Sequence, residues 1–271
     1  HTEPGDFTQE LKISYLNKQP MIVDFLKDSQ HVCGFGPELF ENAPDNRFLP
    51  LTTYRKEFFY VGLALAKSMG VTTDIEWNNA FLSSDAVSNL ALLAGAPQID
   101  SSPDYGTLMN FLAKGNEDAT LDLFNKTVFP SMFDHMLESR RYETEDIARY
   151  GFSLILDGSS TAYFAERHCD GDLVATYHKG TENETSVYRH AALFARVQMC
   201  PGLLHTLCVM PITNKGREPE SKQDCEMNAS YKTIKLIKEE YLKLLFLMQG
   251  DALYANVPFM KIGRASCRER V

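Results

Sequence analysis

The pattern of hydrophobic positions changes character near residue 150. Before this point, apolar residues recur at helical spacing in a series of segments. These segments are Thr53–Met69, Asp74–Leu93 (one helix or a broken pair), Asp104–Lys114 and Glu117–Arg141. After residue 150, short apolar runs without a helical period indicate strands. We therefore predict an α+β protein with a mainly helical N-terminal region over residues 1–148.

The boundaries of the third helix carry the clearest local signals. Ser102 is the expected cap, Pro103 fits the first helical position and Asp104 the first turn, and Gly115 ends the helix. By contrast, the segment Met21–Leu26 fits either a helical turn or a strand.

Strands are predicted in the second half of the chain. The runs are Tyr150–Asp157, Thr161–Ala165 as a possible hairpin partner, Ser186–Gln198, Leu203–Ile212 and Lys243–Gly250. The polar stretch between Ala165 and Ser186 is predicted as a loop. Ser221-Lys-Gln-Asp224 has the form of a capping box that opens a helix before the last strand.

A carboxylate follows each of two strand-like runs. A right-handed crossover through the helix returns the last strand parallel to the first, and the ends of both strands then lie side by side. Asp157 and Asp251 would meet there as oxygen ligands of Mg²⁺ or Mn²⁺ in a phosphoryl-transfer site. The ordinary alternatives are that Asp157 starts a turn with Gly158, and that Asp251 caps a short helix.

This order of strands and helix is that of a ribonuclease H-like core. Several motifs lie along it: Leu156-Asp157-Gly158-Ser159, Tyr163-Phe164, His168-Cys169, Tyr188-Arg189-His190, Gln223-Asp224-Cys225-Glu226, Gly250-Asp251-Ala252-Leu253-Tyr254-Ala255-Asn256 and Pro258-Phe259. The helical part adds Ser102-Pro-Asp-Tyr-Gly-Thr-Leu-Met and a Leu-rich helix that ends in Ser139-Arg-Arg. Over roughly residues 55–260, these motifs resemble the DDE transposases of bacterial insertion sequences.

The resemblance implies a fragment: a helical region followed by the first half of a ribonuclease H-like catalytic domain over residues 149–261, a mixed sheet with a crossover helix. Asp157 and Asp251 correspond to the first two acidic members of the family's catalytic triad. The third, a Glu on a helix well beyond Asp251, is not in this chain, which is therefore expected to be inactive by itself.

The implied activity is metal-dependent DNA strand cleavage and strand transfer. The implied partners are transposon ends and target DNA, bound by a homo-oligomer in the bacterial cytoplasm at the nucleoid. Asp224 and Glu226 are either helix-capping residues or supports beside the metals, while the DNA-binding residues are left unassigned. Two alternatives stay open: a domesticated, non-catalytic DNA-binding or scaffold protein, and another ribonuclease H-like nuclease.

Composition, charge and the last residues of the chain add to this picture. The formal net charge of −9 counts against nucleic-acid binding, which needs Lys and Arg. The six Cys form no C-x-x-C pair and indicate reduced thiols, and no apolar run reaches the length of a membrane span. Residues 262–271 match what a common sequencing-adapter string encodes, and we interpret them as a non-native tail.

Other polar residues have mainly structural interpretations. Neither Cys200, His205 and Cys208 nor His168, Cys169 and His178 are expected to bind zinc. The family motif carries a second Cys shortly after His168-Cys169, where this chain has Asp170-Gly171-Asp172. Tyr254 is expected to be a packing aromatic, and Arg189 and His190 fit either DNA-phosphate contacts or a solvated strand edge.

Overall fold

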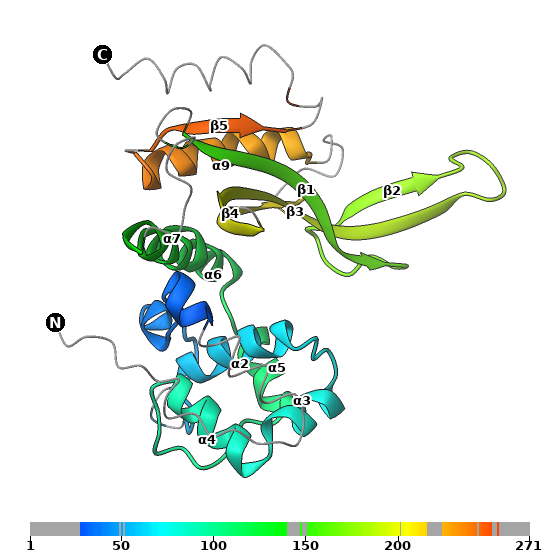
Figure 1. Ribbon diagram of the computed structural model, residues 1–271. Helices are drawn as coiled ribbons and strands as arrows, with labels where there is room; N and C mark the ends of the chain where they lie inside the picture. The colour runs from blue at the N-terminus through cyan, green and yellow to red at the C-terminus, as the bar shows by residue number, and fades with distance from the viewer. Residues whose placement is uncertain are drawn as a thin grey trace. The chain divides into compact units, whose positions relative to one another are not determined.

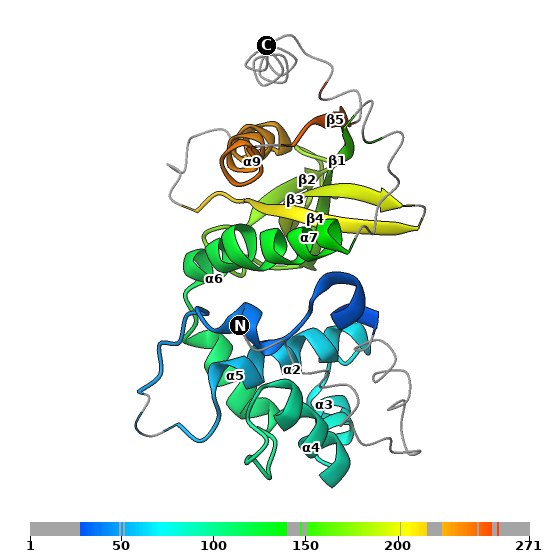
Figure 2. The same ribbon diagram turned by 60° about the vertical axis from the view of Figure 1, so that its left-hand side comes forward.

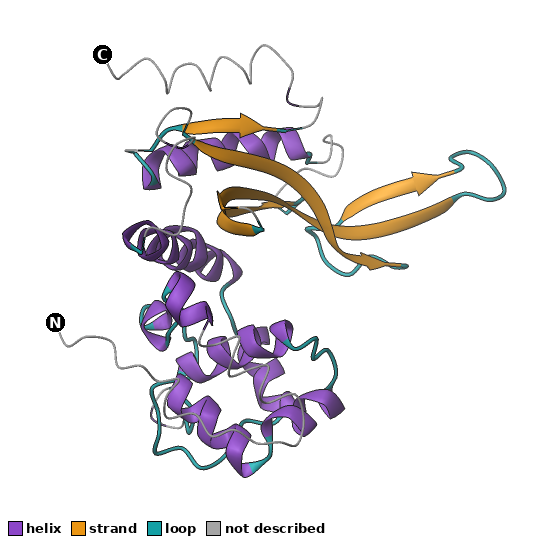
Figure 3. Ribbon diagram, in the orientation of Figure 1, coloured by secondary structure: helices purple, strands orange, loops and turns teal. Residues whose placement is uncertain are grey.

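The computed structural model divides the chain into two compact units, each with its own set of elements. Unit 1 spans residues 1–140 and unit 2 spans residues 141–271. The described residues are 28–48, 50, 52–139, 147, 151–200, 202–215, 224–242, 244–250 and 254. Figure 3 shows helices throughout the described part of unit 1, whereas the strands belong to unit 2. This is the mixed α and β composition that the sequence predicts.

Unit 1 is built from short helices. Its elements are a 3₁₀ turn over Pro37–Phe40, α2 (Lys56–Ser68), α3 (Asp74–Phe81), α4 (Ser84–Leu93), α5 (Tyr105–Ala113), α6 (Glu117–Leu123), a π-helical turn over Phe124–Val128 and α7 (Phe129–Glu138). No helix among the described residues is long and apolar enough to cross a membrane. The segment Met21–Leu26 lies outside these residues.

Helix caps decide how the predicted helical segments divide. Asp74–Leu93 is the broken pair, because Thr73 caps α3 in a capping box with Glu76 and Ser83 caps α4 separately. The predicted cap of α5 was wrong. Asp104, not Ser102, accepts the hydrogen bond from the backbone N–H of Thr107, at 2.6 Å.

The predicted helix Glu117–Arg141 is one helical path with a wide turn inside it. The π-helical turn separates α6 from α7, and Pro130 lies at the start of α7. Proline has no N–H to donate and its ring crowds the carbonyl four residues earlier, that of Lys126. Widening the helix over this turn accommodates both effects.

Aromatic side chains form the core of unit 1. Phe59 stacks on Phe111 with ring centroids 4.3 Å apart, and Trp77 is buried with its indole N–H donating to the carbonyl of Pro103 at 2.9 Å. Trp77 is the only Trp in the chain, so its fluorescence reports on unit 1 alone.

The described residues of unit 2 form a mixed sheet with the helix α9 on its face. Its elements are β1 (Phe152–Phe164), β2 (Leu173–Tyr177), β3 (Thr185–Cys200), β4 (Leu203–Ile212), α9 (Glu226–Glu240) and β5 (Phe246–Gln249). β3 pairs antiparallel with β1 on one side, and with β2 and β4 on the other. β5 pairs parallel with β1 (Figure 1).

The helix between the last two strands completes the crossover. α9 packs against β3 and β4, as the two views of Figures 1 and 2 show. At its end, the hydroxyl of buried Tyr241 donates to the carbonyl of Leu207 on β4 at 3.2 Å. The chain thus returns across one face of the sheet before it enters β5, and the predicted parallel return of the last strand is confirmed.

The strand boundaries differ from the predicted ones in two places. β1 does not end at Asp157 but continues to Phe164, so Thr161–Ala165 is not a separate hairpin partner. An irregularity between Ser160 and Ala162 bends the strand and masks its continuity in the sequence. The predicted loop after Ala165 contains β2. Most residues of this strand are exposed, so its sequence lacks a strong hydrophobic signal.

A close backbone approach starts the pairing of β1 with β5. Gly151 has a φ of +82°, and the N–H of the next residue, Phe152, donates to the carbonyl of Leu245 at 2.8 Å. A Cβ on Gly151 would lie 2.7 Å from the carbonyl carbon of Leu245 and would overlap its oxygen. Since these atoms belong to the backbone, they cannot rotate away.

We expect Gly151→Ala to lower the free energy of unfolding of unit 2 by about 3 kcal/mol. Part of this cost comes from placing Ala at a positive φ, and the rest comes from the overlap of its Cβ with the backbone of Leu245. The control is Gly180→Ala, at φ +79° with nothing within 4 Å of the added Cβ. It should cost only about 1–2 kcal/mol. Urea unfolding followed by circular dichroism measures both, with Trp77 fluorescence as the unit 1 reference. Equal costs for the two variants would contradict the backbone-overlap argument.

Candidate functional site

Asp157 lies on β1 just beyond the described part of the ladder with β5. The last described pair of that ladder is Ile155 with Gln249, and Asp157 follows two residues later on β1, where it pairs with Phe194 of β3. Leu156 is buried and Asp157 is exposed, because successive side chains of a strand point to opposite faces. The hydroxyl of Ser159, on the same face, donates to Oδ2 of Asp157 at 3.3 Å.

Asp251 lies outside the described residues, but the strand leading to it does not. Gln249 precedes Asp251 by two residues, and its partner Ile155 precedes Asp157 by two residues. The described part of the parallel ladder therefore runs in the register that the two-carboxylate prediction requires. The juxtaposition of the carboxylates themselves stays a prediction.

Glu226, at the first position of α9, lies between segments that flank the two aspartates. Its Oε1 accepts a hydrogen bond from the hydroxyl of Tyr254, and its Cγ would lie 3.0 Å from a Cβ added to Gly158. Tyr254 is buried, and its ring occupies the space beside Gly250, where an added Cβ would lie 3.1 Å from Cγ of the ring. Two glycines next to the aspartates in the chain thus make room for one Glu–Tyr pair.

This placement puts Glu226 on the other face of β1 from the Asp157 side chain. Gly158 faces α9, and Asp157 faces away because the strand alternates. The described contacts of Glu226 hold the backbone of β1, the start of α9 and Tyr254 together. Tyr254 packs and donates a hydrogen bond, in line with its interpretation as a packing aromatic.

Asp224 organises the chain just before α9. Its buried carboxylate accepts hydrogen bonds from Nδ2 of Asn228 at 3.0 Å and from the N–H of Thr213 at 3.4 Å. Its own N–H donates to Oδ1 of Asn214 at 2.9 Å. α9 begins at Glu226 with Cys225 in the capping position, so the predicted start within Ser221–Asp224 was wrong. Ser221 itself lies outside the described residues.

A second group of polar side chains surrounds the turn after β1. Donor atoms of His168, Cys169 and His190 all lie within 4.8 Å of one another. Cys169 Sγ is 3.3 Å from His190 Nε2, and the buried Asp172 places Oδ1 2.7 Å from the same nitrogen. His178, which the sequence grouped with His168 and Cys169, lies instead in the turn after β2. His190 takes its place because the β1–β3 register pairs it with Ala162.

Asp172 and Cys169 in this turn have shifted pKa values. Burial by itself would raise the pKa of the Asp172 carboxyl, but hydrogen bonds from the N–H groups of His168 and Cys169, from the Cys169 thiol and from His190 outweigh it and lower the pKa. Burial, reinforced by the hydrogen bond to Asp172, raises the pKa of the Cys169 thiol.

The other three residues that were considered as zinc ligands, Cys200, His205 and Cys208, form no group of metal-binding geometry among the described residues. Cys208 is buried on β4, where burial raises the pKa of its thiol to about 12, and it pairs with Ala195.

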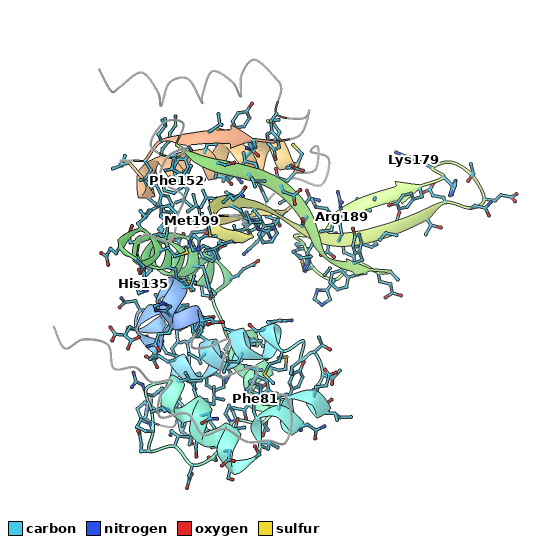
Figure 4. The ribbon with its side chains drawn as sticks, viewed as in Figure 1. Phe81, His135, Phe152, Lys179, Arg189 and Met199 are labelled. Carbon is cyan, nitrogen blue, oxygen red and sulfur yellow. The ribbon has the colours of Figure 1, made fainter. Side chains whose placement is uncertain are left out.

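Arg189 joins strands within unit 2. It pairs with Tyr163 of β1 and with Leu173 of β2, and its Nη1 donates to the hydroxyl of Ser160 at 3.1 Å. Figure 4 shows Arg189 at the base of the β2–β3 hairpin and Lys179 at its tip. A half-buried guanidinium with a strand partner has a structural role whether or not it also meets a phosphate.

Comparisons of the chain with protein-family models, with curated proteins and with solved structures found no match. The geometry of the chain's own residues is therefore the basis for a functional conclusion.

The packing of Glu226 against Gly158 gives a test of this site. Gly158→Ala should push the Glu226 side chain away from Tyr254 and lower the free energy of unfolding by about 1–2 kcal/mol, since a hydrogen bond to a charged group is lost. Glu226→Ala should cost a similar amount for the same reason.

In the double variant the two costs should not add, because the methyl group added at position 158 then has no Glu226 side chain to displace. Urea unfolding of the four proteins, followed by circular dichroism, gives a coupling energy that we expect to be about 1 kcal/mol. Additive costs would show that the two residues do not depend on each other.

Proposed function

We propose that unit 2 is part of a ribonuclease H-like catalytic domain of the DDE transposase type, which cleaves and joins DNA strands with the help of divalent metal ions. The observation that carries the proposal is the parallel pairing of β5 with β1 through the crossover helix α9. It sets Asp157 and Asp251 at equal distances in sequence beyond a shared register pair.

The arrangement of the other strands supports the same conclusion. β4, β3 and β1 form an antiparallel meander, and β5 lies on the opposite side of β1 from β3. The order β4-β3-β1-β5 with a helix before β5 is the order expected of the first half of a ribonuclease H-like core. β2 and the first part of β3 add a hairpin that extends this order (Figure 1).

The residues at the proposed site suit a hard divalent cation. Mg²⁺ is commonly held by one or two carboxylates and keeps several of its waters, so an exposed Asp at the end of a strand ladder is a suitable ligand. Ser159 holds Oδ2 of Asp157, and this hydrogen bond restricts the rotation of the carboxylate. The chemistry that Mg²⁺ or Mn²⁺ supplies in such sites is activation of a water or a 3′-hydroxyl and stabilisation of the leaving oxygen.

The residues around the aspartates fix the site rather than take part in the reaction. Gly151 sets the start of the β1–β5 ladder, and Glu226 with Tyr254 connects the segments next to both aspartates. Positioning of this kind matters because a displacement of about 1 Å at a metal-dependent centre costs roughly 100-fold in rate.

A second candidate is a non-catalytic scaffold derived from such a transposase. The acidic balance of the chain, −9, favours it, since contact with phosphates needs cationic side chains. The two candidates differ in the third acidic residue of the triad. Extending the reading frame in the source nucleic acid beyond Met260 would separate them: a Glu on a downstream helix, with inverted repeats flanking the gene, supports the transposase, and a frame without that Glu supports the scaffold.

Metal binding tests the two aspartates in the chain as it is. We expect Mn²⁺ to bind in unit 2, which electron paramagnetic resonance can measure. Asp157→Asn or Asp251→Asn should weaken the Mn²⁺ affinity more than about tenfold, because losing a residue that merely supports a metal ligand already costs about that much. Glu182→Gln, which removes an exposed carboxylate of the β2–β3 turn, is the matched control and should leave the affinity unchanged.

Strand cleavage tests the activity in the protein extended to its third acidic residue. Asp157→Asn should abolish Mn²⁺-dependent nicking of DNA that carries the inverted repeats flanking the gene. The Glu182→Gln variant should nick the same DNA at the rate of the unaltered protein. Nicking by the Asp157 variant, or Mn²⁺ binding that neither aspartate affects, would rule out the proposed site.

A further inference from the structure

The turn after β1 and the middle of β3 together hold two imidazoles, a thiol and a carboxylate. We propose that His168, Cys169, His190 and Asp172 form a tetrahedral site for Zn²⁺, which fastens the base of the β2–β3 hairpin to the end of β1. This site is separate from the proposed catalytic aspartates. Asp157 pairs with Phe194 and His190 with Ala162, so the two positions lie roughly 15 Å apart along the strands.

Three of the four donor atoms, those of Cys169, His190 and Asp172, are spaced nearly as around a bound zinc ion, and the His168 donor lies within 4.8 Å of those of Cys169 and His190. With bond lengths of about 2.0–2.3 Å, a tetrahedral Zn²⁺ separates its ligand atoms by roughly 3.2–3.6 Å. Cys169 Sγ is 3.3 Å from His190 Nε2 and 3.2 Å from Asp172 Oδ1. The distance of 2.7 Å between His190 and Asp172 is that of a hydrogen bond, and it needs to open by only a fraction of an ångström.

The contacts of His190 argue against a nucleophilic triad made of the same residues. In a Cys–His–Asp triad the carboxylate and the nucleophile use different ring nitrogens of the histidine. In this turn both Cys169 Sγ and Asp172 Oδ1 lie against Nε2 of His190. Donors that converge on one point, rather than form a relay, are the arrangement of a metal site.

The chemistry of the four donors selects the metal. Thiolate and imidazole ligands suit Zn²⁺, whereas Mg²⁺ and Mn²⁺ prefer oxygen ligands. One thiolate, one carboxylate and two neutral imidazoles balance the charge of Zn²⁺. His168 and Cys169 are exposed, which leaves the ion a path of entry.

The surroundings hold the donors in place. Asp172 uses its second oxygen, Oδ2, to accept hydrogen bonds from the N–H groups of His168 and Cys169, at 2.6 and 3.1 Å, which leaves Oδ1 directed at Cys169 and His190. The ring of Phe164 stacks on His168 with centroids 4.8 Å apart and meets His190 edge-on at 5.1 Å. Both imidazoles therefore share one apolar support at the end of β1.

The turn is also anchored from its other side. Asn214, just after β4, donates from Nδ2 to the carbonyl of Asp172 at 2.8 Å, and Thr213 donates from its hydroxyl to the carbonyl of Gly171 at 3.1 Å. An added Cβ on Gly171 would lie 2.6 Å from the Thr213 hydroxyl. Loss of residues that hold metal ligands in place in this way typically lowers the metal affinity by roughly 10–100-fold.

The first experiment measures the metal in the whole chain. Purified protein should bind one Zn²⁺ per chain, and the Co²⁺-substituted protein should show the absorption of a tetrahedral ion together with a thiolate-to-cobalt charge-transfer band. A cobalt spectrum without that band, or one typical of six oxygen ligands, would overturn the proposal. This result does not depend on any variant folding correctly.

The second experiment uses paired variants. Cys169→Ser and His190→Ala should weaken Zn²⁺ binding at least about tenfold, the lower end of what loss of an outer-shell partner costs. Cys225→Ser and His178→Asn remove an exposed thiol and an exposed imidazole elsewhere in unit 2 and should bind as the unaltered chain does.

Asn is chosen at position 178 because His178 has a φ of 53°, which Asn tolerates.

Binding of Zn²⁺ should also slow amide hydrogen exchange at the base of the β2–β3 hairpin. Equal binding by all four variants would overturn the site.

Discussion

The parallel contact between β1 and β5 is the constraint on which the rest of unit 2 depends. It exists because Gly151, at positive φ, lets the backbone reach the carbonyl of Leu245, and the ladder then runs to Ile155 and Gln249. A parallel neighbour requires a crossover, so α9 must lie across the sheet between β4 and β5. The proposed catalytic site depends on that one connection, since without it β5 would not run beside the part of β1 that leads to Asp157.

Hydrogen bonds and a short stretch of backbone link the two polar regions of unit 2. Asp172 closes the turn after β1 and is held through its carbonyl by Asn214. Asn214 accepts a hydrogen bond from the N–H of Asp224, which stands two residues before Glu226, and Glu226 accepts one from Tyr254. The proposed ligands of the two sites share no residue.

The sequence predicted the order of the elements well because burial leaves a strong periodic signal. The helical first half could be read from apolar spacing, and the last strand's parallel return from the rule for crossover connections. The break between α3 and α4 was one of two alternatives for Asp74–Leu93. The continuity of β1 could not, since an irregularity at Ser160 and Ala162 interrupts its alternation. β2 was not predicted because most of its residues are exposed, and such a strand carries little hydrophobic signal.

The partner of His168 and Cys169 escaped for a different reason. His190 is 21 positions from Cys169, and only the register of β3 on β1 determines that it, rather than His178, comes to the turn. The register of β3 on β1 is set by the packing of the sheet and by the connection between the two strands, and that connection was predicted as a loop without β2. Asp157 and Asp251 could be paired as a hypothesis because each follows an apolar strand-like run, so the strand order alone brings both to neighbouring strands. How closely they meet depends on the register of β5 on β1.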